Sequence, residues 1–295
     1  MYLSRFKSSV WFPVVVLLIA MTSIQGGAAL AKTLFSQVGA PGITALRLGL
    51  GTLILLLIFK PWRLHFSKAQ RLPLLLYGLA LGAMNYSFYL AIRTVPLGIA
   101  VGLEFCGPLA LALASSRRLS DFIWVFLALS GLWLLLPLGN AMGNVDTRGA
   151  LLALLAGGFW VVYILTGARA GVGNGPATVA MGSLIGALVF VPLGLSFAGS
   201  GLWYPGIILP GIAIALLSSA LPYSLEMLAL TRLPARVFGT LMSLEPAMAA
   251  LSGMIFLSER LSGMQWLGLL AIISASIGSA LSAPRKKIRL ETVSE

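Results

Sequence analysis

Four ionisable residues lie inside long apolar stretches of this sequence: Arg47, Glu104, Glu226 and Glu245. A charge at the centre of a bilayer costs about 2.5 to 3.5 kcal/mol on insertion scales, so such groups must face protein or a water-filled cavity. Glu104 falls near the middle of its stretch, too far from either end to reach water. Glu226 and Glu245 lie nearer to one end. We expect Glu104 and Glu226 to face a cavity, whereas Glu245 could also reach the membrane surface.

Arg47 and Glu104 together have the chemistry to bind a zwitterion. A guanidinium group binds a carboxylate as a two-pronged fork, and a carboxylate receives an ammonium group. The alternative is a buried ion pair between Arg47 and one of the three glutamates, which would only hold helices together. Buried carboxyl groups can also take up and release protons, so Glu104 and Glu226 are candidates for coupling transport to protons.

Polar and aromatic side chains recur at helical spacing in the same stretches. Asn85 and Tyr89 are four residues apart and share a helix face, with Tyr86 beside them, and Trp160 and Tyr163 share another face. These groups suit a small, hydroxyl-bearing solute and are candidate cavity residues. Packing between helices is the alternative for each of them.

The sequence contains no pattern typical of an enzyme, metal or cofactor site. Its one histidine, His65, lies in a basic segment, and no Cys/His spacing, Ser/His/Asp set or phosphate loop is present. We therefore expect no cofactor, no metal and no enzymatic activity.

Three prolines within the apolar stretches add polar backbone groups to the interior. Pro108, Pro222 and Pro246 each leave a backbone carbonyl without its helical N–H partner near a glutamate.

The composition excludes an ordinary soluble protein. Of 295 residues, 59% are apolar and 9% are charged, against about a quarter charged in soluble domains. The net charge of +12 is not a nucleic-acid footprint, because the Lys and Arg residues lie at the ends of apolar segments and not along one helix face. The single cysteine, Cys106, excludes an intrachain disulfide.

The apolar runs predict an all-α polytopic membrane protein with ten transmembrane helices. They cover approximately residues 11–30, 41–59, 72–92, 95–115, 121–138, 148–168, 177–197, 205–229, 236–257 and 263–282. The first run could instead be a signal peptide, with Arg5 and Lys7 before it and Ala29-Leu30-Ala31 as cleavage site. We favour a retained helix, because cleavage would leave nine spans and disrupt the repeat described below.

The basic residues predict how the helices are oriented. Of the 20 Lys and Arg residues, fifteen fall on the side that includes both termini, four fall on the other side, and Arg47 lies within a span. Short loops rich in Lys and Arg stay in the cytoplasm, so both termini are expected there. The four residues of the opposite side are Lys32, Arg93, Arg148 and Arg260.

The two halves of the chain resemble each other. The run Ser116–Ser120 followed by Trp124 matches Ser258–Ser262 followed by Trp266, at an offset of 142 residues. Five spans thus repeat as five spans, and the second copy must cross the membrane in the opposite direction, because five is odd. We predict repeats at residues 1–140 and 145–295, with a basic cytoplasmic tail on the second. Inverted repeats are typical of alternating-access transporters, although a duplicated membrane protein without transport activity is the alternative.

The sequence resembles the drug/metabolite transporter superfamily, whose members have two five-helix EamA-type repeats. Over nearly the whole chain it is more narrowly similar to the bacterial threonine and homoserine exporters. The runs that carry this likeness are Ser23-Ile24-Gln25-Gly26-Gly27, Gly39-Ala40-Pro41-Gly42, Phe59-Lys60-Pro61-Trp62-Arg63-Leu64, Thr94-Val95-Pro96-Leu97-Gly98-Ile99-Ala100 and Leu221-Pro222-Tyr223-Ser224-Leu225-Glu226-Met227.

The resemblance implies a protein of the bacterial inner membrane that exports threonine and homoserine by proton-coupled efflux. Its expected partners are a small amino acid, protons and the lipid bilayer. Two other functions stay open on sequence alone. One is export of other amino acids, purines or cationic drugs, and the other is a membrane enzyme or assembly subunit, which the short basic loops disfavour.

Overall fold

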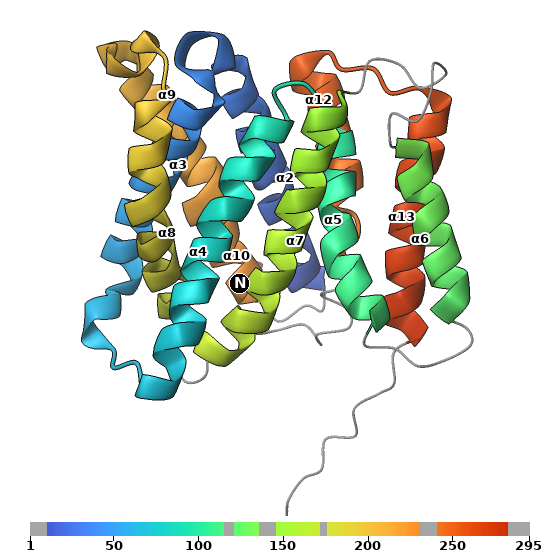
Figure 1. Cartoon of the computed structure of the whole chain (residues 1–295), viewed down its shortest axis with the longest axis horizontal. Coiled ribbons are helices and arrows are strands. Elements are labelled where there is room, and N and C mark those ends of the chain that lie inside the picture. Colours follow the sequence, from blue (N-terminus) through green and yellow to red (C-terminus); the bar gives the residue numbers. More distant parts are fainter. Residues whose placement is uncertain (1–10, 115–120, 136–145, 172–175, 231–240, 283–295) are drawn as a thin grey trace, which may run out of the picture.

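The computed structural model describes residues 11–114, 121–135, 146–171, 176–230 and 241–282, which form a bundle of roughly parallel helices (Figure 1). The first half of the chain contributes α2 (Trp11–Thr33), α3 (Phe35–Phe59), α4 (Lys68–Ala91), α5 (Leu97–Ala114) and α6 (Asp121–Leu135). The second half contributes α7 (Thr147–Ala170), α8 (Pro176–Ser196), α9 (Ile208–Ala215), α10 (Leu221–Leu230), α12 (Glu245–Leu257) and α13 (Gly263–Ser282). A π-helical turn, η4 (Leu216–Ala220), joins α9 to α10.

Three short 3-10 turns complete the described elements. They are η1 (Pro61–Arg63), after α3, and η2 (Ser200–Trp203) and η3 (Pro205–Ile207), before α9. Each predicted span contains a described helix. In the first half of the chain the ends differ most for α3, which begins at Phe35 and bends at Gly39, where φ is +79°. Glycine adopts this conformation without strain. The helix resumes after Gly39, and Pro41 lies in its first turn, where a backbone N–H would have no helical partner.

Six helical segments are long and apolar enough to cross a membrane. They are Phe12–Thr33, Phe35–Phe59, Lys68–Ala91, Thr147–Ala170, Ala177–Ser196 and Pro205–Tyr223. Four further apolar helical segments are shorter in the described part of the chain: Leu97–Leu111, Phe122–Leu134, Glu245–Leu257 and Gly263–Gly278. An all-helical membrane protein is therefore confirmed, while the count of ten spans stays a prediction.

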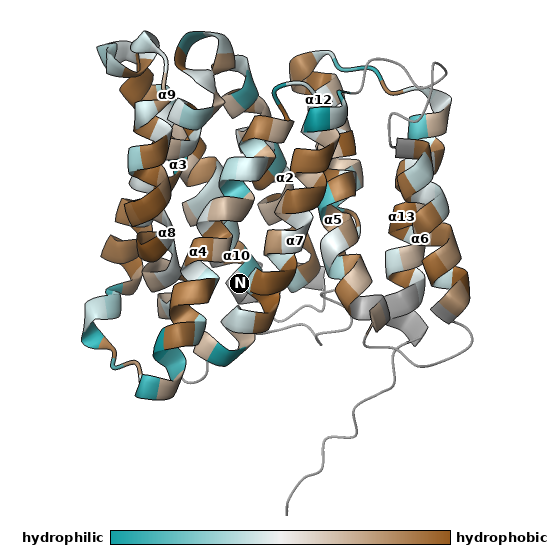
Figure 2. Ribbon diagram, viewed as in Figure 1, coloured by the Kyte–Doolittle hydropathy of each residue, from teal (hydrophilic) through white to brown (hydrophobic). Residues whose placement is uncertain are grey.

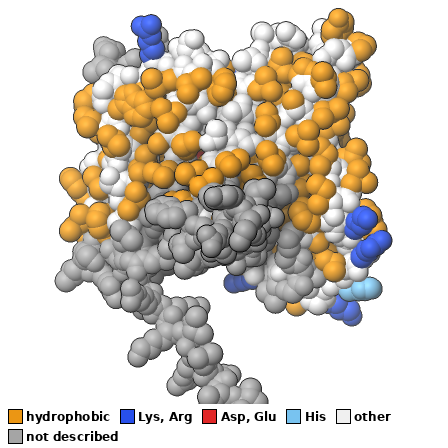
Figure 3. Space-filling view, turned by 180° about the vertical axis from the view of Figure 1, so that it is seen from behind, with side chains coloured by type: hydrophobic (Ala, Val, Ile, Leu, Met, Phe, Trp, Pro, Cys, Tyr) orange, Lys and Arg blue, Asp and Glu red, His pale blue; other side chains and the backbone are white. Residues whose placement is uncertain are grey.

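Apolar side chains cover the outside of the bundle. The helices are hydrophobic along most of their length, and hydrophilic residues gather toward their ends (Figure 2). From behind, apolar side chains cover the described surface between basic groups at its upper and lower ends (Figure 3). Phe126 and Leu209, for example, are 73% and 76% exposed. Such exposure would be unfavourable in water and is expected where lipid is the solvent.

The helices pack in pairs that join the two halves of the chain. Helix α4 packs on α7 and α8, and α3 packs on α8 and α9. Helix α2 packs on α10 and α12, α5 packs on α7 and α12, and α6 packs on α13. Glycines allow close approach: a Cβ on Gly78 of α4 would lie 2.6 Å from the carbonyl oxygen of Gly182 on α8. Small residues at helix contacts are typical of membrane bundles.

The packing of α2 supports the prediction that the first apolar run is a helix of the folded protein and not a signal peptide. Ala29 and Ala31, the proposed cleavage site, are fully buried within α2. The basic residues before α2, in residues 115–120 and 231–240, and after α13 lie outside the described residues, as does the run Ser116–Ser120.

A charged contact ties three elements together at one end of the bundle. The Lys32 ammonium at the end of α2 lies 2.6 Å from Oε1 of Glu259, in the loop between α12 and α13. Lys32 also donates to the carbonyl oxygen of Val95, at 2.9 Å. Oε2 of Glu259 accepts the backbone N–H of Leu97, the first residue of α5, at 2.7 Å. Glu259 of the second half therefore binds a charged side chain and a helix N-terminus of the first half.

Candidate substrate-binding site

Arg47 lies in the interior of the bundle, on α3, with only 5% of its surface exposed. Its Nη1 donates a hydrogen bond to Oδ1 of Asn85 on α4, and its Nη2 donates to the carbonyl oxygen of Ser218 in η4, at 2.8 Å. Its Cζ lies 5.1 Å from the centre of the Tyr89 ring, a cation–π contact. Two other elements, α4 and η4, therefore hold the guanidinium group, and all three partners are neutral.

A proline explains why the Ser218 carbonyl is available to Arg47. In an α-helix this carbonyl would accept the N–H of residue 222, which is Pro222 and has none. In the π register of η4, where Leu221 bonds to Leu216, residue 222 would reach Leu217 instead. The expectation that Pro222 frees a backbone carbonyl is thus supported, in both registers.

The carbonyls of Ser218 and Leu217 both accept hydrogen bonds from side chains of the first half of the chain. Arg47 bonds to the Ser218 carbonyl, and the hydroxyl of Ser23 on α2 donates to the Leu217 carbonyl at 2.8 Å. Backbone carbonyls without a partner are costly inside a membrane. These side chains therefore supply the hydrogen bond that the missing N–H of Pro222 cannot give. They also make the π-helical turn depend on residues far away in the sequence.

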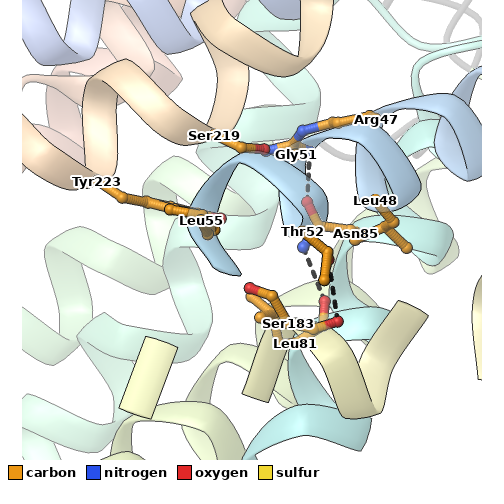
Figure 4. A pocket seen from close by; sticks show the side chains of 10 residues that line it. All are labelled: Arg47, Leu48, Gly51, Thr52, Leu55, Leu81, Asn85, Ser183, Ser219 and Tyr223. Carbon is orange, nitrogen blue, oxygen red and sulfur yellow. Dashed lines mark hydrogen bonds between the residues drawn. The ribbon is translucent and has the colours of Figure 1, made fainter. Parts of the chain in front are cut away.

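A narrow pocket opens beside Arg47 (Figure 4). The centre of a water-sized sphere can move through about 10 Å³ of it, which is room for about one water molecule. Its walls come from α3, α4, α8, η4 and α10, and combine one guanidinium group with an amide, four hydroxyl groups and three leucines. The lining residues are Arg47, Leu48, Gly51, Thr52, Leu55, Leu81, Asn85, Ser183, Ser219 and Tyr223. The lining groups are therefore chemically complementary to an anionic group and a polar side chain.

The predicted site residues on α3 and α4 come together. Asn85 lines the pocket, bonds Arg47 and donates from its own amide to the Leu81 carbonyl at 2.7 Å. Tyr89 is fully buried under the guanidinium, and its hydroxyl has no hydrogen-bond partner among the described residues. The three residues predicted from their spacing along α4 and from the charge in α3 thus meet, although Tyr89 does not line the pocket.

The three glutamates lie on α5, α10 and α12 and do not line the pocket. Glu104 on α5 and Glu245 at the start of α12 are 8% and 7% exposed, and Glu226 on α10 is partly buried. Glu104 and Glu245 are close enough to act on each other electrostatically, as are Glu245 and Glu226, and Arg47 acts on Glu104. No ion pair joins Arg47 to any of them in the described structure.

Glu245 is held inside and does not extend to the surface. Its Oε1 accepts a hydrogen bond from the amide of Gln25 on α2, at 3.2 Å, and its Oε2 has no partner among the described residues. It is the first residue of α12, after a turn at Ser243 and Leu244, so its charge lies at a helix N-terminus. Of the two positions open to Glu245, the structure supports the interior one.

The remaining aromatic candidates pack in pairs outside the pocket. Tyr86 lies against Phe190, with ring centres 5.8 Å apart, and Trp160 packs edge-on to Phe105 at 5.8 Å. Tyr163 stacks on Tyr77 at 4.6 Å. These contacts agree with the packing alternative, and a direct role of Tyr86, Trp160 and Tyr163 in binding stays a prediction.

Several pocket residues had no distinguishing signal in the sequence. Thr52, Ser183, Ser218 and Ser219 are small hydroxyl residues within apolar runs, and such residues are common in membrane helices. Ser218 and Ser219 do precede Pro222 by four and three residues. That spacing from an interior proline is the signal that could have marked them.

Known proteins similar to this chain are transporters. The sequence pattern of the EamA-like transporter family matches residues 147–281. Threonine/homoserine exporter RhtA of Salmonella typhimurium strain LT2 is 68% identical, over 95% of each chain. The RhtA of Escherichia coli K12 is 65% identical, over 97% of this chain and 96% of its own. An uncharacterized transporter of Bacillus subtilis strain 168, YwfM, is 30% identical over 80% of this chain and 82% of its own.

One solved crystal structure, described only as that of a protein, has the same fold. It superposes with a TM-score of 0.60 and covers 91% of this chain and 97% of its own, at 20% identity. A likeness at this identity concerns the fold alone.

Proposed function

The chain belongs to the EamA-like transporter family, and we propose that it exports L-threonine and L-homoserine across the bacterial inner membrane in exchange for protons. The observation that carries this proposal is the 68% identity, over 95% of both chains, with a relative named as a threonine/homoserine exporter. A transporter, unlike an enzyme, needs no catalytic motif, only a site that can face either side of the membrane.

We propose ten spans in two inverted repeats, residues 1–140 and 145–295, with both termini in the cytoplasm. The packing supports this proposal, because exchanging the halves maps most of the helix pairs onto each other. The α4–α7 pair corresponds to α10–α2, α5–α7 corresponds to α12–α2, and α4–α8 corresponds to α9–α3. The pairs α3–α8, α5–α12 and α6–α13 map onto themselves, as expected for a two-fold axis between the halves.

Arg47 is the proposed partner of the substrate carboxylate. It is a buried cation that contacts an amide, a carbonyl and an aromatic ring, and no carboxylate lies within ion-pair distance among the described residues. A buried charge without a counter-ion is unfavourable, so an anionic ligand would stabilise it. Its Nε is buried and has no hydrogen-bond partner among the described residues, so this N–H can also bind a ligand.

Glu104 and Glu226 are the proposed proton-coupling residues. A carboxylate that binds either a proton or the substrate ammonium couples the two ligands, because one site cannot hold both. The cytoplasm-facing state would load the amino acid, and the outward-facing state would load the proton. The driving force is adequate, since each charge that moves through 100 mV gains about 2.3 kcal/mol.

A counterflow assay on the purified full-length protein in liposomes tests this function. Vesicles loaded with unlabelled threonine should accumulate labelled threonine and homoserine. A proton gradient directed into the vesicles should drive net efflux of either amino acid. Labelled purines, a cationic dye and large neutral amino acids serve as the comparison panel. Uptake of a panel compound in place of the two hydroxy amino acids would contradict the proposed substrate.

A further inference from the structure

The pocket beside Arg47 contains a cation and hydroxyl groups but no carboxylate. Its lining includes the hydroxyls of Thr52, Ser183, Ser219 and Tyr223, while the three glutamates lie outside it. A pocket of this chemistry can bind a carboxylate and a neutral hydrogen-bonding group. It offers no counter-ion for a substrate that carries only positive charge.

Ser219 occupies a defined place in this pocket. It follows Ser218, whose carbonyl holds Arg47, so the position of its hydroxyl is tied to the guanidinium. The residue is 6% exposed, and its hydroxyl has no hydrogen bond to another described residue. Gly51 on α3 leaves space in front of it, because a Cβ at Gly51 would lie 3.1 Å from the Ser219 Oγ.

Ser183 and Thr52 supply a second polar wall. The Thr52 hydroxyl donates to the Ser183 carbonyl at 3.2 Å, which joins α3 to α8. The Ser183 side chain is 4% exposed, and its hydroxyl likewise has no hydrogen bond to another described residue. Two buried serine hydroxyls from different elements therefore line one pocket without a partner in the described structure (Figure 4).

We propose that Ser219, together with Ser183, binds the side-chain hydroxyl of the amino acid whose carboxylate Arg47 holds. This inference rests on the proposed function and specifies how its substrates are selected. Threonine and homoserine both carry a hydroxyl on a short side chain. Two rotatable serine hydroxyls, each of which can donate or accept, can bind a hydroxyl on either the β-carbon or the γ-carbon of the substrate.

Selection of this kind follows from burial. A site built to hydrogen-bond a hydroxyl discriminates strongly against the analogue without it, because the buried partners are left unpaired. 2-Aminobutyrate is the deoxy analogue of both threonine and homoserine. The parent protein should therefore prefer threonine over 2-aminobutyrate by at least about tenfold.

Competition measurements on the full chain in liposomes test the role of Ser219. Exchange of labelled threonine is measured against unlabelled threonine, homoserine and 2-aminobutyrate. Ser219→Ala should reduce the preference for threonine over 2-aminobutyrate to about threefold or less, and exchange of 2-aminobutyrate should persist. Ser196→Ala is the matched control, because the Ser196 hydroxyl bonds carbonyls of its own helix on the outside of α8. An unchanged preference in Ser219→Ala would overturn the inference.

Two further variants decide the matter if Ser219→Ala does not fold. Gly51→Ala places a methyl group against Ser219 and should lower threonine exchange at least about fivefold, whereas Gly49→Ala, whose Cβ would lie 3.7 Å from Val191, should stay within about twofold. Ser183→Ala should also reduce the preference. Normal exchange by Gly51→Ala with normal preference in Ser183→Ala would refute the assignment.

The parent protein separates this inference from the proposed function. If it exchanges neither threonine nor homoserine, the proposed function fails and the inference with it. If it exchanges both but treats 2-aminobutyrate equally well, the function stands and the hydroxyl site is wrong.

Discussion

The guanidinium of Arg47 donates a hydrogen bond of 2.8 Å to the backbone carbonyl of Ser218, a residue 171 positions further along the chain. Pro222 has no N–H, so it leaves either this carbonyl, in the α register, or that of Leu217, in the π register, without a helical partner. A charge in the second predicted span thus satisfies a backbone group in the eighth. This contact joins the two halves of the chain at the wall of the pocket.

Replacing Arg47 by lysine should lower threonine exchange at least about tenfold while the protein still folds. Lysine keeps the positive charge but cannot contact Asn85, Ser218 and a carboxylate with a planar fork. Initial exchange rates at matched protein levels measure the effect. Arg63→Lys, in the exposed turn η1, is the control and should behave as the parent. A well-folded Arg47→Lys protein with normal transport would refute the role of Arg47.

Glu104→Gln should abolish proton-driven accumulation but permit exchange. Glutamine keeps the size and hydrogen bonding of glutamate and cannot titrate. Net accumulation under a pH gradient and counterflow without a gradient are compared in the same liposomes. Glu226→Gln is the parallel variant, since Glu226 is the second coupling candidate. If both variants accumulate threonine uphill as well as the parent, neither carboxylate couples transport to protons.

Pro222→Ala should stabilise the protein and slow transport. The new N–H can close the helix on the Ser218 or Leu217 carbonyl, which removes a defect worth up to about 3 kcal/mol and displaces Arg47 or Ser23. Thermal unfolding in detergent and exchange rates report the two effects. Pro192→Ala, in α8, is the control that changes a helix proline away from Arg47. A variant with unchanged exchange would show that the freed carbonyls are not needed.

Glu259→Gln should loosen the end of the bundle where α2, α5 and the α12–α13 loop meet. It removes the counter-ion of Lys32, whose side chain is 18% exposed, and weakens the bond to the Leu97 N–H. We expect a loss of about 1 to 2 kcal/mol in unfolding free energy. Arg260→Gln, an exposed neighbour, should have little effect. A double-mutant cycle with Lys32→Met measures the interaction free energy between Lys32 and Glu259. An interaction energy near zero would contradict a stabilising role of this ion pair.

Asp146 should make stability depend on pH in the acid range. The backbone N–H of Gly149 and then the hydroxyl of Thr94 bind its carboxylate and lower its pKa in the folded state. Its contribution is therefore complete above the unfolded pKa, near 4, and is lost as pH falls through the lower folded value. Melting temperatures of the parent and Asp146→Ala should differ at pH 7, and the difference should shrink as the pH falls below about 4. A difference that does not change with pH would contradict this assignment.

Much of the architecture follows from local patterns in the sequence. Apolar runs of about 20 residues predict helices regardless of their neighbours, because every backbone polar group in a membrane must be bonded within its own segment. The described helices lie in each predicted range for the same reason. Arg47 and Glu104 were identifiable because a charge in such a run must be buried in protein, which is where the structure places them.

The partners of these residues could not be predicted, because they are neutral and distant in sequence. An apolar run containing serines gives no indication that Ser218 and Ser219 face Arg47, and only the packing of α3 against η4 brings them there. Likewise Lys32 and Glu259 are 227 residues apart, and no periodicity links them.

The sequence by itself determined that this protein is a helical membrane protein with an arginine and three glutamates inside its apolar segments, since hydropathy and charge act residue by residue. Only the tertiary structure decided that Arg47 bonds Asn85 and Ser218 in place of a glutamate, and that a pocket lined by hydroxyls lies beside it. The reason is physical: a long, flexible guanidinium can reach several acceptors, and helix packing selects among them.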